Sequence, residues 1–88
     1  MFEIRLSRQA QRYYERVDRP TASRLDKCFA ALEQAPLSGP QIKPLKAKGR
    51  MSFRYRVGSL RVLYDVDLAR QVVEVTAILP RGQAYREK

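Results

Sequence analysis

The spacing of the apolar residues changes once along this chain, and that change constrains the fold more than any other feature. In the N-terminal half the apolar side chains recur at helical intervals and share one face: Leu25, Cys28, Phe29 and Leu32. After Met51 the interval becomes two, as in a strand with one buried face. Because helices precede a group of strands, the sequence predicts an α+β domain.

The N-terminal half contains the start signals of two helices. Phe2–Leu6 alternates apolar and polar residues, which indicates a strand, and Ser7 follows at the position of a helix N-cap. We expect one short helix over Arg8–Arg16 and a second that begins after Asp18 and ends near Gln34. The two helices would form an αα-hairpin.

A segment rich in proline and glycine separates the helices from the later strands. Pro36, Gly39, Pro40 and Pro44 interrupt regular structure, which predicts a mobile loop that extends to Arg50.

Three strands are expected after this loop. Met51–Val57 and Leu60–Val66 alternate on either side of Gly58 and Ser59, a pair that favours a two-residue hairpin turn. Val72–Leu79 is almost continuously apolar, which predicts a strand in the centre of the sheet. With the N-terminal strand, these elements predict a small, mainly antiparallel four-stranded sheet on which the αα-hairpin packs.

The length and composition limit the classes of protein that the chain can represent. At 88 residues it is expected to form one domain, 1–88, which ends in a short helical turn or coil after Pro80. One cysteine and no histidine give no pair for a disulfide or a zinc site, so we expect no metal and no cofactor. No apolar run has the length of a signal peptide or a membrane span, which predicts a soluble cytoplasmic protein.

Positive charge is concentrated in one window of the chain. Between Gln34 and Tyr64 there are seven basic residues and no acidic one, which accounts for most of the net charge of +9. A local excess of this kind is typical of a surface that binds a polyanion. The residues expected to bind RNA or phosphate, in this window and in the tail, are Lys43, Lys46, Lys48, Arg50, Arg54 and Arg86.

The predicted hairpin places two arginines opposite each other. With the turn at Gly58 and Ser59, Arg56 faces Arg61 on the next strand. Like charges in opposed positions cost up to about 1 kcal/mol, so selection for stability alone would avoid them. Two guanidiniums about 5 Å apart suit a phosphate, because each can donate two hydrogen bonds to its oxygens. The alternative is that both side chains simply extend into water.

The segments Phe53–Val66 and Val75–Arg86 resemble the RelE/ParE superfamily of toxins from type II toxin–antitoxin modules. The shared features are a basic hairpin strand, an arginine that opens the next strand, and an arginine and a tyrosine in the tail. The resemblance implies a RelE-like microbial RNase fold and a ribosome-dependent endoribonuclease that cuts messenger RNA in the decoding site of the small subunit. It also implies inhibition by a cognate antitoxin, with operator DNA contacted only through the antitoxin complex.

The resemblance further implies roles for single residues. Arg61 and Arg81 match the phosphate-binding arginines of the family, and Tyr85 matches its tail tyrosine. Arg54 and Arg56 stand where the RelE branch has two lysines, one of them a candidate general base. Arginine stays protonated, so neither residue can take over that proton transfer.

RNA cleavage without metal or histidine is feasible if the ribose 2′-OH attacks the adjacent phosphate. Arg56, Arg61 and Arg81 would stabilise the charge of the five-coordinate phosphate. The proton would move through Tyr85, whose pKa nearby cations would lower, or through a lysine of the loop. Tyr85 could instead stack on a base, and the loop lysines could instead contact ribosomal RNA or nothing specific.

Two other functions remain open at the level of sequence. The ParE branch of the superfamily poisons DNA gyrase and has no nuclease activity. The loss of the lysine pair agrees with that branch, whereas the retention of Arg61, Arg81 and Tyr85 argues for the nuclease branch. The third possibility is a non-catalytic RNA-binding module, which would explain the charge but leaves Arg81 and Tyr85 without a role.

Overall fold

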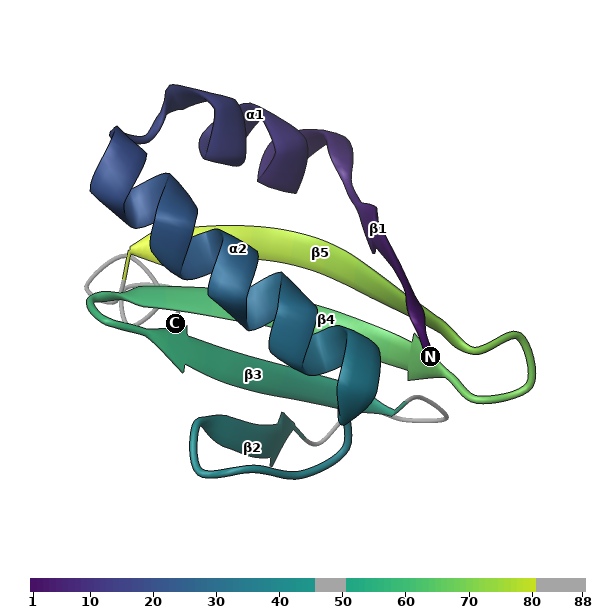
Figure 1. The fold of residues 1–88 in the computed structure, drawn as a ribbon. Helices are drawn as coiled ribbons and strands as arrows, with labels where there is room; N and C mark the ends of the chain where they lie inside the picture. Colours follow the sequence, from purple (N-terminus) through teal and green to yellow (C-terminus); the bar gives the residue numbers. More distant parts are fainter. Residues whose placement is uncertain (46–50, 81–88) are drawn as a thin grey trace.

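The elements of the fold follow the predicted order, with one additional strand (Figure 1). The computed structural model describes residues 1–45 and 51–80. Its elements are β1 (Glu3–Leu6), α1 (Arg8–Arg16), α2 (Arg19–Gln34), β2 (Ile42–Leu45), β3 (Ser52–Val57), β4 (Leu60–Asp67) and β5 (Val72–Pro80). Within the described residues the strands form one sheet in the order β1-β5-β4-β3-β2, in which only β1 and β5 are parallel. The α+β class is confirmed.

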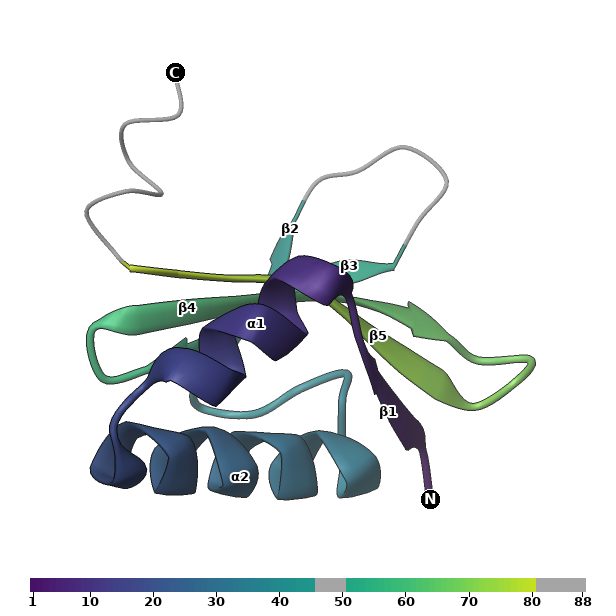
Figure 2. The ribbon, with the colours of Figure 1, turned by 90° about the horizontal axis from the view of Figure 1, so that it is seen from above.

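Both helices cover the same face of the sheet, and polar side chains fix where each begins (Figure 2). Ser7 Oγ accepts a hydrogen bond from the Ala10 amide at 3.1 Å and donates one to the Thr76 carbonyl of β5 at 2.9 Å. Asp18 accepts a bond from the Thr21 amide at 3.2 Å, and hydrogen bonds from the Thr21 side chain and from this amide lower the pKa of the Asp18 carboxyl. The two predicted helix starts are therefore confirmed as N-caps.

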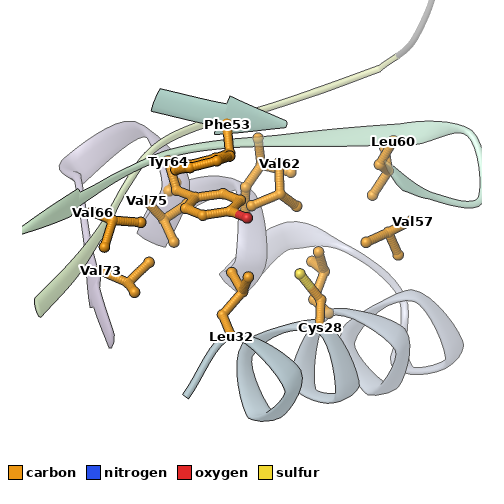
Figure 3. Packing of buried hydrophobic residues seen from close by; sticks show 13 residues of the cluster. Cys28, Leu32, Phe53, Val57, Leu60, Val62, Tyr64, Val66, Val73 and Val75 are labelled. Atoms are coloured by element: carbon orange, nitrogen blue, oxygen red, sulfur yellow. The ribbon is translucent and has the colours of Figure 1, made fainter. Parts of the chain in front are cut away.

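The hydrophobic core lies between α2 and the helix-facing side of the sheet (Figure 3). Leu25 and Leu32 of α2 are fully buried with the valines of β4 and β5. The rings of Phe53 and Tyr64 stack with centroids 5.5 Å apart. The Tyr64 hydroxyl donates to the buried Pro36 carbonyl at 2.7 Å, which ties the segment after α2 to the sheet. Tyr64 therefore lies inside the core.

The predicted hairpin register is confirmed. Gly58 and Ser59 form the turn, and Gly58 has a φ of 56°, in the left-handed region that glycine adopts at low cost. Arg56 pairs with Arg61, and Arg54 pairs with Leu63. The two opposed arginines thus lie on neighbouring strands, as the turn chemistry predicts.

The prediction of a loop from residue 36 to residue 50 is wrong for its middle part, because Ile42–Leu45 forms strand β2. This strand pairs antiparallel with β3, with Lys43 opposite Arg54 and Pro44 opposite Phe53. A proline is tolerated here because β2 is an edge strand and one of its sides makes no ladder bonds. The sheet consequently has five strands within the described residues instead of four.

β5 lies inside the sheet, between β1 and β4, and it contains an irregularity that the sequence does not reveal. Leu63 pairs with Ala77 while Tyr64 pairs with Val75, so Thr76 is an extra residue on β5. A bulge of this kind shifts the alternation of a strand by one residue. It keeps both Val75 and Ile78 in the core, although they are three positions apart.

Some predictions fall on residues outside the described ranges. These are the helical turn or coil after Pro80 and the structural context of Lys46, Lys48, Arg50, Arg81, Tyr85 and Arg86. In the part of the chain that the structure describes, no helix is long and apolar enough to cross a membrane.

Cys28 is buried in the core, as its place on the apolar helix face predicts. Burial raises the pKa of the Cys28 thiol to about 12, so the folded protein keeps the thiol proton where the unfolded chain loses it. Stability should therefore fall as pH rises from about 9 towards 12, and a Cys28→Ala variant should lose this contribution. Urea melts of both proteins across this range measure it, and equal pH dependence would contradict the assignment.

Candidate functional site

Basic side chains gather on the face of the sheet opposite to α1 and α2, which we call the far face. Core residues of β3 and β4 point towards the helices, so the residues that alternate with them lie on the far face. Four of these are cations, and we call them the basic cluster: Lys43, Arg54, Arg56 and Arg61. They come from three neighbouring strands, β2, β3 and β4, which follow one another along the chain.

The register of the strands fixes the spacing within the basic cluster. Lys43 is the direct partner of Arg54, and Arg56 is the direct partner of Arg61. Directly opposed residues have Cβ atoms about 4.5–5.5 Å apart. The backbone amide of Arg56 also donates to the Gln41 carbonyl at 3.0 Å, which fastens the segment before β2 to β3. The cluster is therefore held by backbone pairing rather than by flexible loops.

A hollow of about 220 Å³ opens beside three members of the basic cluster. Its described lining residues are Pro40, Gln41, Ile42, Lys43, Arg54 and Arg56, and none of them carries a carboxylate. The hollow can receive a phosphate or a similar small anion, because cationic groups with several N–H donors border it.

Arg61 differs from the other cations because it is only 6% exposed. The Nε atoms of Arg61 and Arg54 are both buried, and both side chains interact with other groups of the folded protein. Burial lowers the local dielectric constant, so the charge of Arg61 acts more strongly on a nearby anion than an exposed charge does. The sequence places Arg61 in the site but gives no sign of this burial.

Tyr55 and Tyr64, the two tyrosines of β3 and β4, do not supply a proton acceptor for the site. Tyr55 and Tyr64 lie on the helix-facing side, and burial raises the pKa of both hydroxyl groups. Both hydroxyls therefore keep their protons at neutral pH. The candidates named from the sequence, Tyr85 and the loop lysines, lie outside the described residues, apart from Lys43.

A polar pair borders the basic cluster and was not expected from the sequence. Ser52 Oγ donates to Asp65 Oδ1 at 2.6 Å across β3 and β4. Asp65 also pairs with Glu74 of β5, which in turn pairs with Arg5 of β1. The far face therefore changes from basic to acidic between β3 and β5. The signal was present in the hairpin register, which places Ser52 opposite Asp65.

The residues of the far face do not form an evident metal site. Within residues 1–45 and 51–80, no three His, Cys, Asp or Glu side chains come together in a way that could hold a metal ion.

Comparison with known proteins identifies the family. Residues 4–85 match the family model of the ParE toxin of the type II toxin–antitoxin system parDE. A comparison with curated proteins returns no match.

Several solved toxin structures share the fold of this chain. The archaeal RelE–RelB complex from Pyrococcus horikoshii OT3 has a TM-score of 0.83 at 21% identity, covering 93% of this chain and 97% of that chain. The RelBE2 toxin–antitoxin complex of Mycobacterium tuberculosis has a TM-score of 0.72 at 26% identity, covering 91% and 98%. A YoeB/ParE toxin from Agrobacterium tumefaciens has a TM-score of 0.77 at 19% identity, covering 90% and 98%.

The family model covers almost the whole chain, and the α+β fold matches those of solved RelE-like toxin structures. This protein therefore belongs to the ParE toxin family of type II toxin–antitoxin systems, within the RelE/ParE superfamily.

Proposed function

We propose that this toxin is a ribosome-dependent endoribonuclease that cleaves messenger RNA and so inhibits translation in the cytoplasm. The observation that carries the proposal is the basic cluster, in which Arg56 and Arg61 oppose each other on a rigid hairpin. Such an arrangement costs stability and is explained by a phosphate that accepts bonds from both guanidiniums.

The chemistry would use the substrate's own nucleophile. The ribose 2′-oxygen bonds to the adjacent phosphorus, the bond from phosphorus to the 5′-oxygen breaks, and a 2′,3′-cyclic phosphate forms. Arg56, Arg61 and Arg81 would stabilise the additional negative charge of the five-coordinate phosphate. A base, for which Tyr85 and a loop lysine are the candidates, would take the 2′-OH proton, and an acid would protonate the leaving oxygen. Arg54 and the other cations would hold the RNA backbone.

The partners follow from the family and from the charge. A cognate antitoxin would silence the toxin in growing cells, and RelE–RelB and RelBE2 are themselves toxin–antitoxin complexes. Ribosomes and messenger RNA are the proposed targets, since the basic cluster suits a polyanion.

A second candidate function is supported by the family match. The family model is that of a ParE toxin, and the ParE branch poisons DNA gyrase. Arg54 and Arg56 in place of the two lysines of the RelE branch agree with that alternative.

Brief expression of the toxin in cells separates these functions. Primer extension on abundant messenger RNAs should reveal cuts within translated codons, and the cuts should disappear when the message is not translated. Double-strand breaks in DNA without such cuts would instead support a gyrase poison. Growth arrest without cuts or breaks would support a binding module.

A further inference from the structure

A groove of about 690 Å³ lies against α1, away from the basic cluster. Its described lining residues are Arg8, Gln9, Arg12, Tyr13, Arg16 and Val17. Figure 1 shows α1 beyond the β5 side of the sheet, whereas β2, which carries Lys43, forms the opposite edge. The groove and the basic cluster are therefore on separate surfaces of the molecule.

The three arginines of the groove form a line along the helix. Arg8, Arg12 and Arg16 follow one another at intervals of four residues and are all exposed. Each interval raises the side chain by about 6 Å along the axis and rotates it by only about 40°. All three side chains line the groove, and their backbone positions rise in steps similar to the distance between successive phosphates along a nucleic-acid strand.

The charges around the line favour an anionic partner. The first turn of α1 contains no acidic residue, so the positive end of the helix dipole adds to the charge of Arg8. The one carboxylate of α1, Glu15, accepts a hydrogen bond from Gln11 at 3.3 Å and does not line the groove.

The groove suits a phosphodiester backbone better than an amphipathic helix. A docked helix needs a row of apolar anchors, but the exposed large hydrophobic residues in the described part of the chain all lie outside α1. Tyr13 and Val17 are already partly buried against the core. Arginines that flank a partly exposed aromatic ring are the usual composition of an RNA-binding surface.

We propose that this side of α1 is a second RNA-binding surface, which holds the phosphate backbone of folded RNA while the basic cluster receives the strand to be cut. The proposal rests on the proposed ribosome-dependent function, because a ribosome, which is made largely of folded RNA, can contact both surfaces at once. The proposal itself states only that Arg8, Arg12 and Arg16 neutralise phosphates of a structured RNA.

The test uses the full chain and a fluorescent RNA duplex of about 16 base pairs. Anisotropy titrations between about 50 and 200 mM salt give the slope of log affinity against log salt concentration. In the variant Arg8→Gln/Arg12→Gln/Arg16→Gln the magnitude of this slope should fall by roughly 2–3, as expected for three lost phosphate contacts. The lysine variant Arg8→Lys/Arg12→Lys/Arg16→Lys keeps the charges, so its slope should stay within about one of the parent value.

A matched control removes three exposed cations elsewhere. Arg19→Gln/Lys27→Gln/Arg70→Gln loses the same formal charge from α2 and from the turn after β4, and its slope should fall by less than about one. An equal loss in this control would show that only net charge matters, and would overturn the proposal. An unchanged slope in the glutamine variant would also overturn it, as would a loss of antitoxin binding with duplex binding intact.

The duplex assay separates this proposal from the proposed nuclease function. If the parent protein cuts no RNA but the slopes follow the expected pattern, the surface assignment stands and the nuclease function fails. If the parent protein cuts messenger RNA while the glutamine variant binds the duplex like the parent, only the surface assignment fails.

Discussion

Replacing Arg61 by alanine should slow single-turnover cleavage of ribosome-bound messenger RNA by about 10²-fold or more, the effect of losing one strong donor to a developing oxyanion. Arg61 is 6% exposed and directly opposes Arg56, which lines the hollow, so its charge lies on the strand next to that cation. The loss corresponds to about 2.7 kcal/mol of transition-state stabilisation. Ribosome binding should change much less, because exposed cations of the cluster remain.

The matched control for this prediction is Arg70→Ala. Arg70 lies in the turn between β4 and β5, where its side chain is largely exposed. The Arg70→Ala variant should cleave messenger RNA at the rate of the parent protein. Because Arg61 is buried, thermal melts must show that the alanine variant is folded, and Arg61→Lys gives a second variant that keeps the charge. If a folded Arg61→Ala protein cleaved at the rate of the parent protein, Arg61 would have no role in catalysis.

Replacing Leu32 by alanine should have the largest effect on stability. Leu32 is 0% exposed and lies in the centre of the core (Figure 3). A buried leucine cut back to alanine costs about 2–5 kcal/mol through lost burial and the cavity that remains. For a domain of this size the melting temperature should fall by roughly 10–25 °C.

Leu68→Ala is the control for the core prediction, since Leu68 is 47% exposed in the turn after β4. Its free energy of unfolding should stay within about 0.5 kcal/mol of the parent value. Denaturant melts of the two variants measure the difference, and similar losses in both would mean that α2 does not pack as described.

The helices and the β3–β4 hairpin could be predicted because their signals are local. Ser7 and Asp18 cap the helices through bonds to amides three residues later, and Gly58 adopts the backbone conformation that the turn needs. Two features of the sheet depend instead on the pairing of one strand with the next, which no local signal within the strand reveals. β2 contains Pro44 and becomes a strand only because β3 is beside it, and the bulge at Thr76 exists only relative to β4.

The sequence predicts which residues belong to the candidate site, but it does not predict fully how they lie relative to one another. The opposition of Arg56 and Arg61 follows from turn length alone, and the structure confirms it. The pairing of Lys43 with Arg54 could not be predicted without knowing that β2 forms. The burial of Arg61 could not be predicted because it depends on the packing of the whole fold. The groove of α1 was missed because its three arginines fall outside the acid-free window, although their spacing of four residues is visible in the sequence. The roles of Arg81 and Tyr85 stay predictions.

The central claim is that this toxin cuts messenger RNA through the ribose 2′-oxygen, and one measurement tests it most directly. Ribosomes programmed with a messenger RNA that carries a single 2′-deoxy nucleotide at the cut site are treated with the toxin, beside the unmodified message. We expect cleavage of the unmodified message with 2′,3′-cyclic phosphate ends, and no cleavage at the deoxy position. Equal cleavage of both messages, with 5′-phosphate ends, would contradict the account.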